Sequence, residues 1–295
     1  MSSYQAVKSV EEGAAEAAVQ PTVYRLQVEW WRWIAYLSFW GMCMFAGIMF
    51  LLTVSPFMGP CPLTPGAEPT YGAHCSDLKA MFGFNNICVT WDYSPSREAT
   101  ALVYPLFEYS LIAYVIFDFL QRKNDYDNGL LCEKTYKVSS VLLKIKIVLI
   151  AWFRMIFVCA VDQGPIPLRP FGGELDAVTA HTLGFFGMQF ALVLIAFENV
   201  GYMIITEKDM WGMSVETTKK AAIAYLVTLF VVTCLKVSWA SSIFIFGSPW
   251  IDAPWPNIFD RFWMVLAAVM PLFFAQWGMR NEPDMVITIV NEKKE

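Results

Sequence analysis

Six long apolar stretches limit what this chain can fold into more than any other feature of its sequence. Each holds enough hydrophobic residues to cross a bilayer core of about 30 Å as an α-helix. They cover residues 30–55, 99–120, 139–161, 177–205, 220–246 and 258–279. Because 57% of the residues are hydrophobic and the charges gather between the stretches, we predict an all-α, polytopic membrane protein with a bundle of six transmembrane helices.

The gaps between the stretches are too short to hold a separate soluble domain. We therefore predict a cytosolic N-terminal tail (1–29), one six-helix transmembrane domain (30–280) with a long outer loop (56–97), and a cytosolic C-terminal tail (281–295). This orientation follows from Lys and Arg, which are retained on the cytosolic side and here lie mostly on the side of the two tails.

The outer loop carries three cysteines on the side where an oxidising environment permits a disulfide. These are Cys61, Cys75 and Cys88. We expect one pair and one remaining thiol, and the sequence leaves open which two pair. The loop starts rich in proline and ends in Trp91-Asp92-Tyr93-Ser94-Pro95, which predicts a compact cap. That cap is either a structural lid or a surface for a ligand or partner.

Charged residues inside the apolar stretches cost about 2.5–3.5 kcal/mol each at the bilayer centre unless they pair, snorkel or meet water. The predicted topology sorts them into two layers, in which acids and bases from different helices can neutralise one another. The non-cytosolic layer holds Glu108, Arg154, Asp162, His181 and Lys236, and the cytosolic layer holds Asp118, Lys144, Lys146 and Glu198. Lys144 and Lys146 also lie close enough to the cytosolic boundary to snorkel.

From these layers we take candidates for the lining of a ligand site or polar cavity. They are Glu108, Arg154, Asp162, His181, Lys236 and Glu198, joined in the outer loop by Asp92 and the three cysteines. Internal salt bridges are the alternative interpretation of the same residues. Glu198 continues a stripe of small residues on the fourth stretch, which lets helix backbones approach closely and predicts a central helix. The stripe comprises Ala177, Ala180, Gly184, Gly187 and Ala191.

Several activity classes can be compared with this inventory. A multi-histidine zinc site cannot be built from His74 and His181 alone, and a retinal protein requires seven helices. We expect no metal site and no cofactor. A lipid-modifying enzyme with His181 as base and Asp162 as its orienting acid remains open, although no nucleophile identifies itself. A transporter also remains open, without an internal repeat to support it.

The junction between the third and fourth stretches carries a family resemblance. Arg154, then Asp162-Gln163, a short proline-rich loop and His181-Thr-Leu-Gly184-Phe-Phe-Gly187, together with the predicted topology, resemble the FRAG/DRAM/Sfk superfamily of six-helix membrane proteins. That family includes damage-regulated autophagy modulators and a Golgi protein involved in remodelling GPI-anchor lipids. The resemblance implies Asp92, Arg154, Asp162 and His181 as matched polar positions. The family's Pro-Tyr-Ile-Ser-Asp-type loop motif and its acid after the histidine are missing here.

The sequence therefore predicts a non-enzymatic regulator or scaffold that acts on membrane lipid organisation or trafficking. The alternatives are a transporter or channel for a small solute or lipid and, third, a lipid-modifying enzyme. We expect membrane lipids as partners, with a protein partner through the outer loop or a larger membrane complex as a further option, and no nucleic acid. The compartment stays open between lysosome, Golgi and plasma membrane.

Overall fold

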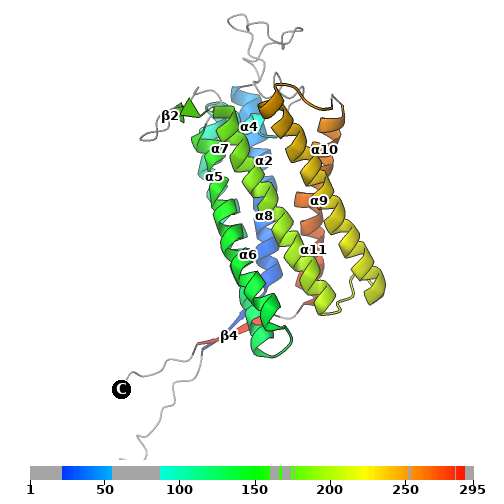
Figure 1. The fold of residues 1–295 in the computed structure, drawn as a ribbon. Helices are drawn as coiled ribbons and strands as arrows, with labels where there is room; N and C mark the ends of the chain where they lie inside the picture. The colour runs from blue at the N-terminus through cyan, green and yellow to red at the C-terminus, as the bar shows by residue number, and fades with distance from the viewer. Residues whose placement is uncertain are drawn as a thin grey trace, which may run out of the picture.

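The computed structural model describes residues 22–54, 87–159, 166–167, 174–175, 177–251, 254–282 and 284–289. Long helices run antiparallel to one another in a single bundle (Figure 1). In chain order they are α2 (Val28–Thr53), α5 (Ser96–Asp127), α6 (Glu133–Trp152), α8 (Ala177–Ile205), α9 (Val215–Phe246), and a last segment made of α10 (Trp255–Met264), the π-helical turn η3 (Val265–Val269) and α11 (Met270–Asn281). The short helices are α4 (Val89–Asp92) and α7 (Met155–Val158).

The two described ends of the chain meet at one end of the bundle. There β1 (Thr22–Leu26) pairs antiparallel with β4 (Met285–Ile289), a small sheet that the sequence analysis did not predict. We call this the β1–β4 end, and the opposite end, which holds α4, the α4 end (Figure 1). The other two strands in the described residues, β2 (Ile166–Pro167) and β3 (Glu174–Leu175), are two residues long each and pair with one another.

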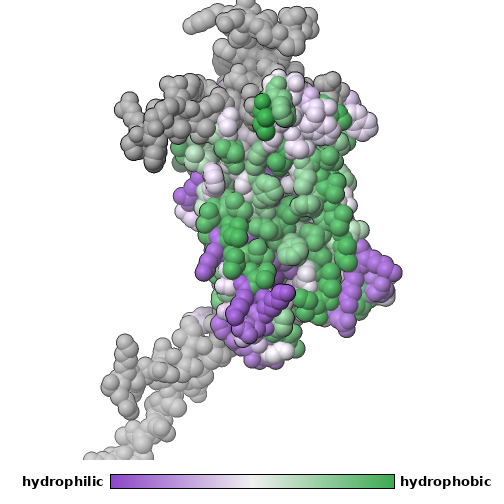
Figure 2. Space-filling view, in the orientation of Figure 1, coloured by the Kyte–Doolittle hydropathy of each residue, from purple (hydrophilic) through white to green (hydrophobic). Residues whose placement is uncertain are grey.

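Five helical segments are long and apolar enough to cross a membrane. They cover Val28–Thr53, Ser96–Asp127, Thr179–Ile205, Val215–Ile243 and Trp255–Asn281. Figure 2 shows the corresponding apolar belt, with hydrophilic residues gathered near the β1–β4 end. This composition supports an integral, multi-pass membrane protein. Helix α6 packs in the bundle against α5 and α8, but it is only 20 residues long and contains Lys144 and Lys146, so the sixth predicted crossing stays a prediction.

Helix α8 is the most deeply buried of the five candidate spans. Two glycines of its small-residue stripe, Gly184 and Gly187, face α7 and α6, and the close approach agrees with the spacing. A Cβ atom added at Gly184 would lie 3.2 Å from the Cβ of Met155, and one at Gly187 would lie 3.6 Å from the carbonyl oxygen of Leu149. The small residues therefore let the two backbones approach closely, and they bring the polar residues of α8 within reach of α5 and α6.

The last segment changes from α- to π-helical geometry just before Pro271, which has no backbone N–H to donate. Two side chains from other helices satisfy carbonyl groups in this turn. The indole of Trp40 donates to the carbonyl of Ala268 at 3.2 Å, and the hydroxyl of Tyr225 donates to that of Leu266 at 3.0 Å. These bonds fix the turn against α2 and α9.

Aromatic rings fill the interior toward the α4 end. The ring of Phe153 lies 6.0 Å from Trp91, 6.5 Å from Phe107 and 6.2 Å from Phe185, measured between centroids. Phe185 in turn lies 5.9 Å from Trp263. The aromatic series thus links α4 to α10 across the bundle.

Candidate functional site

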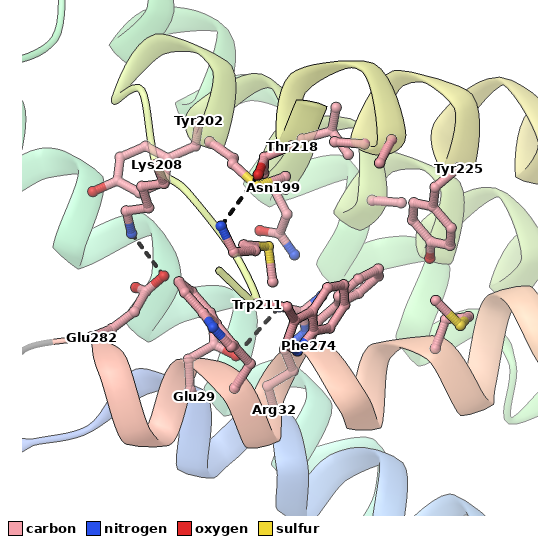
Figure 3. Close-up of a pocket in the computed structure, with 18 of the residues that line it drawn as sticks. Glu29, Arg32, Asn199, Tyr202, Lys208, Trp211, Thr218, Tyr225, Phe274 and Glu282 are labelled. Atoms are coloured by element: carbon pink, nitrogen blue, oxygen red, sulfur yellow. Dashed lines mark hydrogen bonds and ion pairs between the residues drawn. The ribbon is translucent and has the colours of Figure 1, made fainter. Parts of the chain in front are cut away.

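A cavity of about 170 Å³ lies at the β1–β4 end, between α2, α5, α8, α9 and α11 (Figure 3). This is more than ten times the roughly 10–15 Å³ that a single water needs. Its polar wall contains Glu29, Arg32, Asp118, Asn199, Lys208 and Glu282, and its apolar wall includes Trp211, Ala222, Tyr225, Met270 and Phe274. A few convergent polar groups beside an apolar wall are typical of a ligand site.

Arg32 is the most distinctive residue of the cavity wall. It lies in the second turn of α2 and is only 8% exposed. Its Nη1 donates to Oε2 of Glu29 at a long 3.3 Å, and its guanidinium lies 5.7 Å from the ring centroids of Tyr114 and Phe274. Among the described residues its Nε has no hydrogen-bond partner. A buried guanidinium normally uses more of its five N–H donors, so this charge is only partly compensated.

The connection between α8 and α9 borders the cavity. Lys208 pairs with Glu282 at 2.8 Å and lies 4.8 Å from the ring centroid of Tyr202. Trp211 stacks on Phe274 with centroids 5.5 Å apart. Trp211 has a φ angle of 51°, in the left-handed region that a bulky residue rarely adopts. The stacking of Trp211 on Phe274 and the nearby ion pair of Lys208 with Glu282 hold the connection in this strained conformation.

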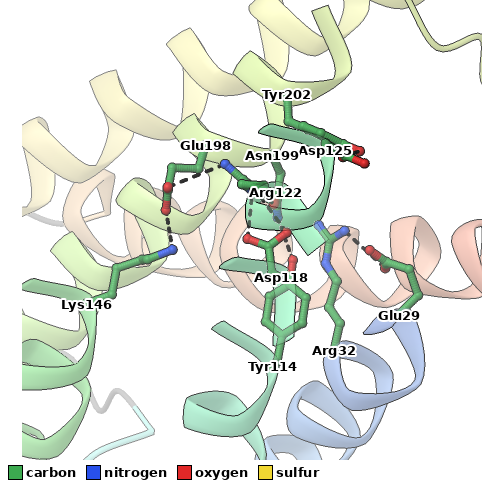
Figure 4. Close-up of polar contacts among 10 residues, drawn as sticks. All are labelled: Glu29, Arg32, Tyr114, Asp118, Arg122, Asp125, Lys146, Glu198, Asn199 and Tyr202. Atoms are coloured by element: carbon green, nitrogen blue, oxygen red, sulfur yellow. Dashed lines mark hydrogen bonds and ion pairs between the residues drawn. The ribbon is translucent and has the colours of Figure 1, made fainter. Parts of the chain in front are cut away.

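Beside the cavity lies a connected group of buried charges, which we call the Arg122 network (Figure 4). Glu198 accepts hydrogen bonds from Lys146 and, at 3.4 Å, from Nη1 of Arg122. Nη2 of Arg122 lies 2.9 Å from Asp118 and donates to Asn199 at 3.0 Å. The network takes two acids and two bases from α5, α6 and α8. Its charges therefore balance inside the protein.

Two candidate residues at the α4 end, Arg154 and Glu108, form an ion pair. The Nε of Arg154 donates to both carboxylate oxygens of Glu108, at 2.8 and 2.7 Å, and its Nη2 donates to the hydroxyl of Tyr109 at 3.1 Å. The Glu108 side chain is 1% exposed, whereas that of Arg154 is 51% exposed. This pair therefore extends from the buried face of α5 to the surface of the bundle.

Lys236 has a partner that the sequence analysis did not name. Its Nζ lies 2.5 Å from Oδ1 of Asp260 on α10. The same ammonium group lies 4.7 Å from the ring centroid of Phe185 and 4.3 Å from that of Trp263. The carboxylate supplies the opposite charge, and the two aromatic faces add cation–π attraction. Lys236 is thus enclosed on several sides.

His181 lies against Asp92, with Nε2 and Oδ1 3.3 Å apart and both residues buried. The backbone carbonyl of Asp92 accepts a hydrogen bond from Nη1 of Arg97 at 3.3 Å. Asp162, which the sequence analysis weighed as the partner of His181, lies outside the described residues. Two of the positions matched to the family resemblance, Asp92 and His181, are therefore neighbours, while Arg154 belongs to another pair.

The predicted outer-loop disulfide lies mostly outside the described residues, because these do not include Cys61 and Cys75. Cys88 is described: it is 3% exposed and directly precedes α4. Burial raises the pKa of its thiol well above the ordinary value. The disulfide stays a prediction.

Several residues of the cavity escaped the sequence analysis. Arg32 and Lys208 entered it only through the count of Lys and Arg residues that set the orientation. A signal for Arg32 did exist, because it sits between Trp31 and Trp33 at the start of an apolar stretch. An arginine between aromatic residues at such a boundary either snorkels or enters the bundle, and the sequence alone does not distinguish the two.

Within the described residues, no group of three or more His, Cys, Asp or Glu side chains could hold a metal ion. Comparisons with protein-family models, with curated proteins and with solved structures find no match to this chain. The geometry of the cavity and of the charge pairs is therefore the basis for inferring a function.

Proposed function

We propose that this protein is a non-enzymatic regulator or scaffold that acts on membrane lipid organisation or trafficking. The observation that supports this proposal is the closure of the buried charge pairs. Lys146 with Glu198 and Lys236 with Asp260 are neutral pairs enclosed by protein. Proton relays and ion pathways need ionisable groups that reach water or exchange partners, whereas closed pairs in a packed interior hold helices together.

The same pairs support a topology with six crossings. The charge of Lys146 would oppose membrane insertion of α6, but its partner Glu198 on α8 compensates it inside the bundle. Lys144 is exposed and can snorkel toward the boundary. In this proposal α6 is the third span, both tails are cytosolic, and the β1–β4 end faces the cytosol, in a lysosomal, Golgi or plasma membrane.

Membership of the FRAG/DRAM/Sfk superfamily is part of the same proposal. The contact between Asp92 and His181 supports it, because the resemblance matched both positions. The proposal also includes a protein partner that binds the outer loop.

A transporter is the second candidate, and the cavity at the β1–β4 end favours it. A polar cavity that opens at one end of a bundle can be one half of an alternating-access pathway. In this arrangement, movement of a substrate toward the α4 end would require the Arg122 network and the aromatic series to rearrange.

Reconstitution of the purified protein in liposomes tests both candidates. We expect fluorescent lipid analogues to cluster, seen as increased energy transfer between labelled lipids, without ion flux, lipid exchange between leaflets or chemical change of the lipids above protein-free liposomes. Lys236→Met provides a control for flux. Transport that this substitution abolishes in a folded protein would overturn the scaffold proposal, and so would lipid turnover.

A further inference from the structure

We propose that the cavity at the β1–β4 end binds the anionic head group of a single-chain amphiphile, a carboxylate or phosphate carried on an apolar chain, with Arg32 as its charge partner. This inference rests on the proposed function, because it names the ligand through which a lipid regulator would sense its membrane. It concerns a part of the bundle that the sequence analysis did not single out.

The unused hydrogen-bond donors of one cation in the wall favour an anion. Glu282 is paired with Lys208 at 2.8 Å, and Asp118 is paired with Arg122 at 2.9 Å. Arg32 is also paired with one carboxylate, that of Glu29, but this contact is longer, at 3.3 Å. Its Nε is buried and has no hydrogen-bond partner among the described residues. The guanidinium therefore has unused donors, and planar forks of N–H groups match carboxylate and phosphate oxygens.

The shape of the polar and apolar walls favours an amphiphile. In Figure 3 the pair of Lys208 and Glu282 lies at one side of the cavity, and Tyr225 lies at the other. The wall that continues toward Tyr225 includes Met270 and Phe274. Methionine adapts its shape to irregular apolar groups. A head group beside Arg32 would thus place its chain along apolar side chains that lead into the bundle.

The volume of the cavity fits a head group and the start of one chain. Engineered apolar cavities of about 150 Å³ bind benzene, so the 170 Å³ of this cavity can enclose a small head group with its first carbons, while the rest of the chain extends beyond it. A phospholipid would have to place the first carbons of two acyl chains in the same space.

A binding experiment with matched ligands tests the proposal. Full-length protein in phosphatidylcholine nanodiscs is titrated with oleate, lysophosphatidic acid, monooleoylglycerol and dodecyltrimethylammonium, and bound ligand is measured by equilibrium dialysis and native mass spectrometry. We expect oleate, lysophosphatidic acid or both to bind at least tenfold more tightly than the neutral and the cationic amphiphile. Oleate alone would identify the head as a carboxylate, and lysophosphatidic acid alone would identify it as a phosphate.

Variants connect the binding to the cavity. Arg32→Gln should weaken binding of the anionic amphiphile at least tenfold, and Arg32→Lys should weaken it less because the charge remains. Arg25→Gln is the matched control, since Arg25 is an exposed arginine on β1 at the same end and should leave binding unchanged. Ala222→Phe fills the cavity while Arg32 stays in place, so it should abolish binding. Thermal unfolding of each variant shows that the protein is folded.

The outcomes separate this inference from the proposed function. Equal binding of the neutral or cationic amphiphile would overturn the inference, as would unchanged binding in both Arg32→Gln and Ala222→Phe. Displacement of oleate by acetate or inorganic phosphate at the same concentration as by unlabelled oleate would overturn the role of the chain. A complete lack of binding overturns the cavity site and leaves the scaffold proposal intact. Recovery of a chemically altered ligand overturns the scaffold proposal and leaves the site.

Discussion

The two ends of the bundle treat buried charge in different ways. At the α4 end, Lys236 with Asp260 and Arg154 with Glu108 are separate pairs, and aromatic rings such as Phe185 pack between helices there. At the β1–β4 end, charges are joined through shared partners in the Arg122 network, which lies next to an open cavity. At the first end Lys236 and Arg154 pair with different carboxylates, whereas at the second end Lys146 and Arg122 share Glu198.

The chemistry of the cations explains much of this difference. An ammonium is a compact point charge, and Lys236 uses it on one carboxylate and two ring faces. A guanidinium presents five donors in a planar fork, and Arg122 uses this fork to join Asp118, Glu198 and Asn199. The comparison teaches that Arg122 joins three partners at one end, whereas Lys236 and Arg154 each meet one carboxylate at the other.

The largest expected effect comes from breaking the network. Glu198→Gln removes the carboxylate shared by Lys146 and Arg122 and leaves both cations buried, which should lower the free energy of unfolding by about 3–5 kcal/mol. Steric-trapping measurements in bicelles report this value. The double variant Lys146→Met with Glu198→Leu should recover most of the loss, because it removes both charges. Glu216→Gln, at an exposed pair with Lys220, is the control and should change stability by less than about 1 kcal/mol.

A smaller loss is expected at the α4 end. Asp260→Asn leaves Lys236 without its carboxylate but still in contact with the rings of Phe185 and Trp263. We expect a loss of about 2 kcal/mol, because cation–π contacts of a desolvated ammonium retain part of the compensation. The same unfolding measurement applies. A loss larger than that of Glu198→Gln would contradict the view that the network is the more strongly coupled region.

The smallest effect compares two glycines of α8, one toward each end. A Cβ at Gly201 meets nothing within 4 Å, whereas one at Gly184 would lie 3.2 Å from the Cβ of Met155. Gly201→Ala should therefore stabilise the helix by about 0.5–1 kcal/mol, and Gly184→Ala should gain less or destabilise. The difference between their unfolding midpoints in detergent measures how tightly α8 packs at the α4 end. Equal shifts would show that the close approach at Gly184 has no energetic consequence.

Much of the helical architecture could be predicted from the sequence. Hydrophobic length alone indicates where helices must lie in lipid, because the backbone has to satisfy its own hydrogen bonds there. The small-residue spacing around Gly184 and Gly187 also predicted the face of α8 that packs closely. The sheet of β1 and β4 was not predicted, since its two strands are separated by the whole described bundle, and local patterns do not report such distant pairing.

The candidate site was harder to predict. The sequence analysis found Glu198, Glu108, Arg154, His181 and Lys236 because a charge inside an apolar stretch is visible in one dimension. It did not single out Arg32, Lys208 or Asp260, since these residues lie near helix ends, where depth depends on how each helix is placed. The cavity itself uses residues from five helices, and no single segment carries its pattern.

The sequence by itself determined that the chain builds a bundle of apolar helices, because hydrophobic length and the cost of unpaired backbone in lipid leave few alternatives. Only the tertiary structure decided which charges meet. Partner choice depends on helix rotation and on distances of a few ångströms between segments far apart in the chain. That is why Lys236 proved to be paired with Asp260, and why Arg32 proved to line a cavity with donors still unused.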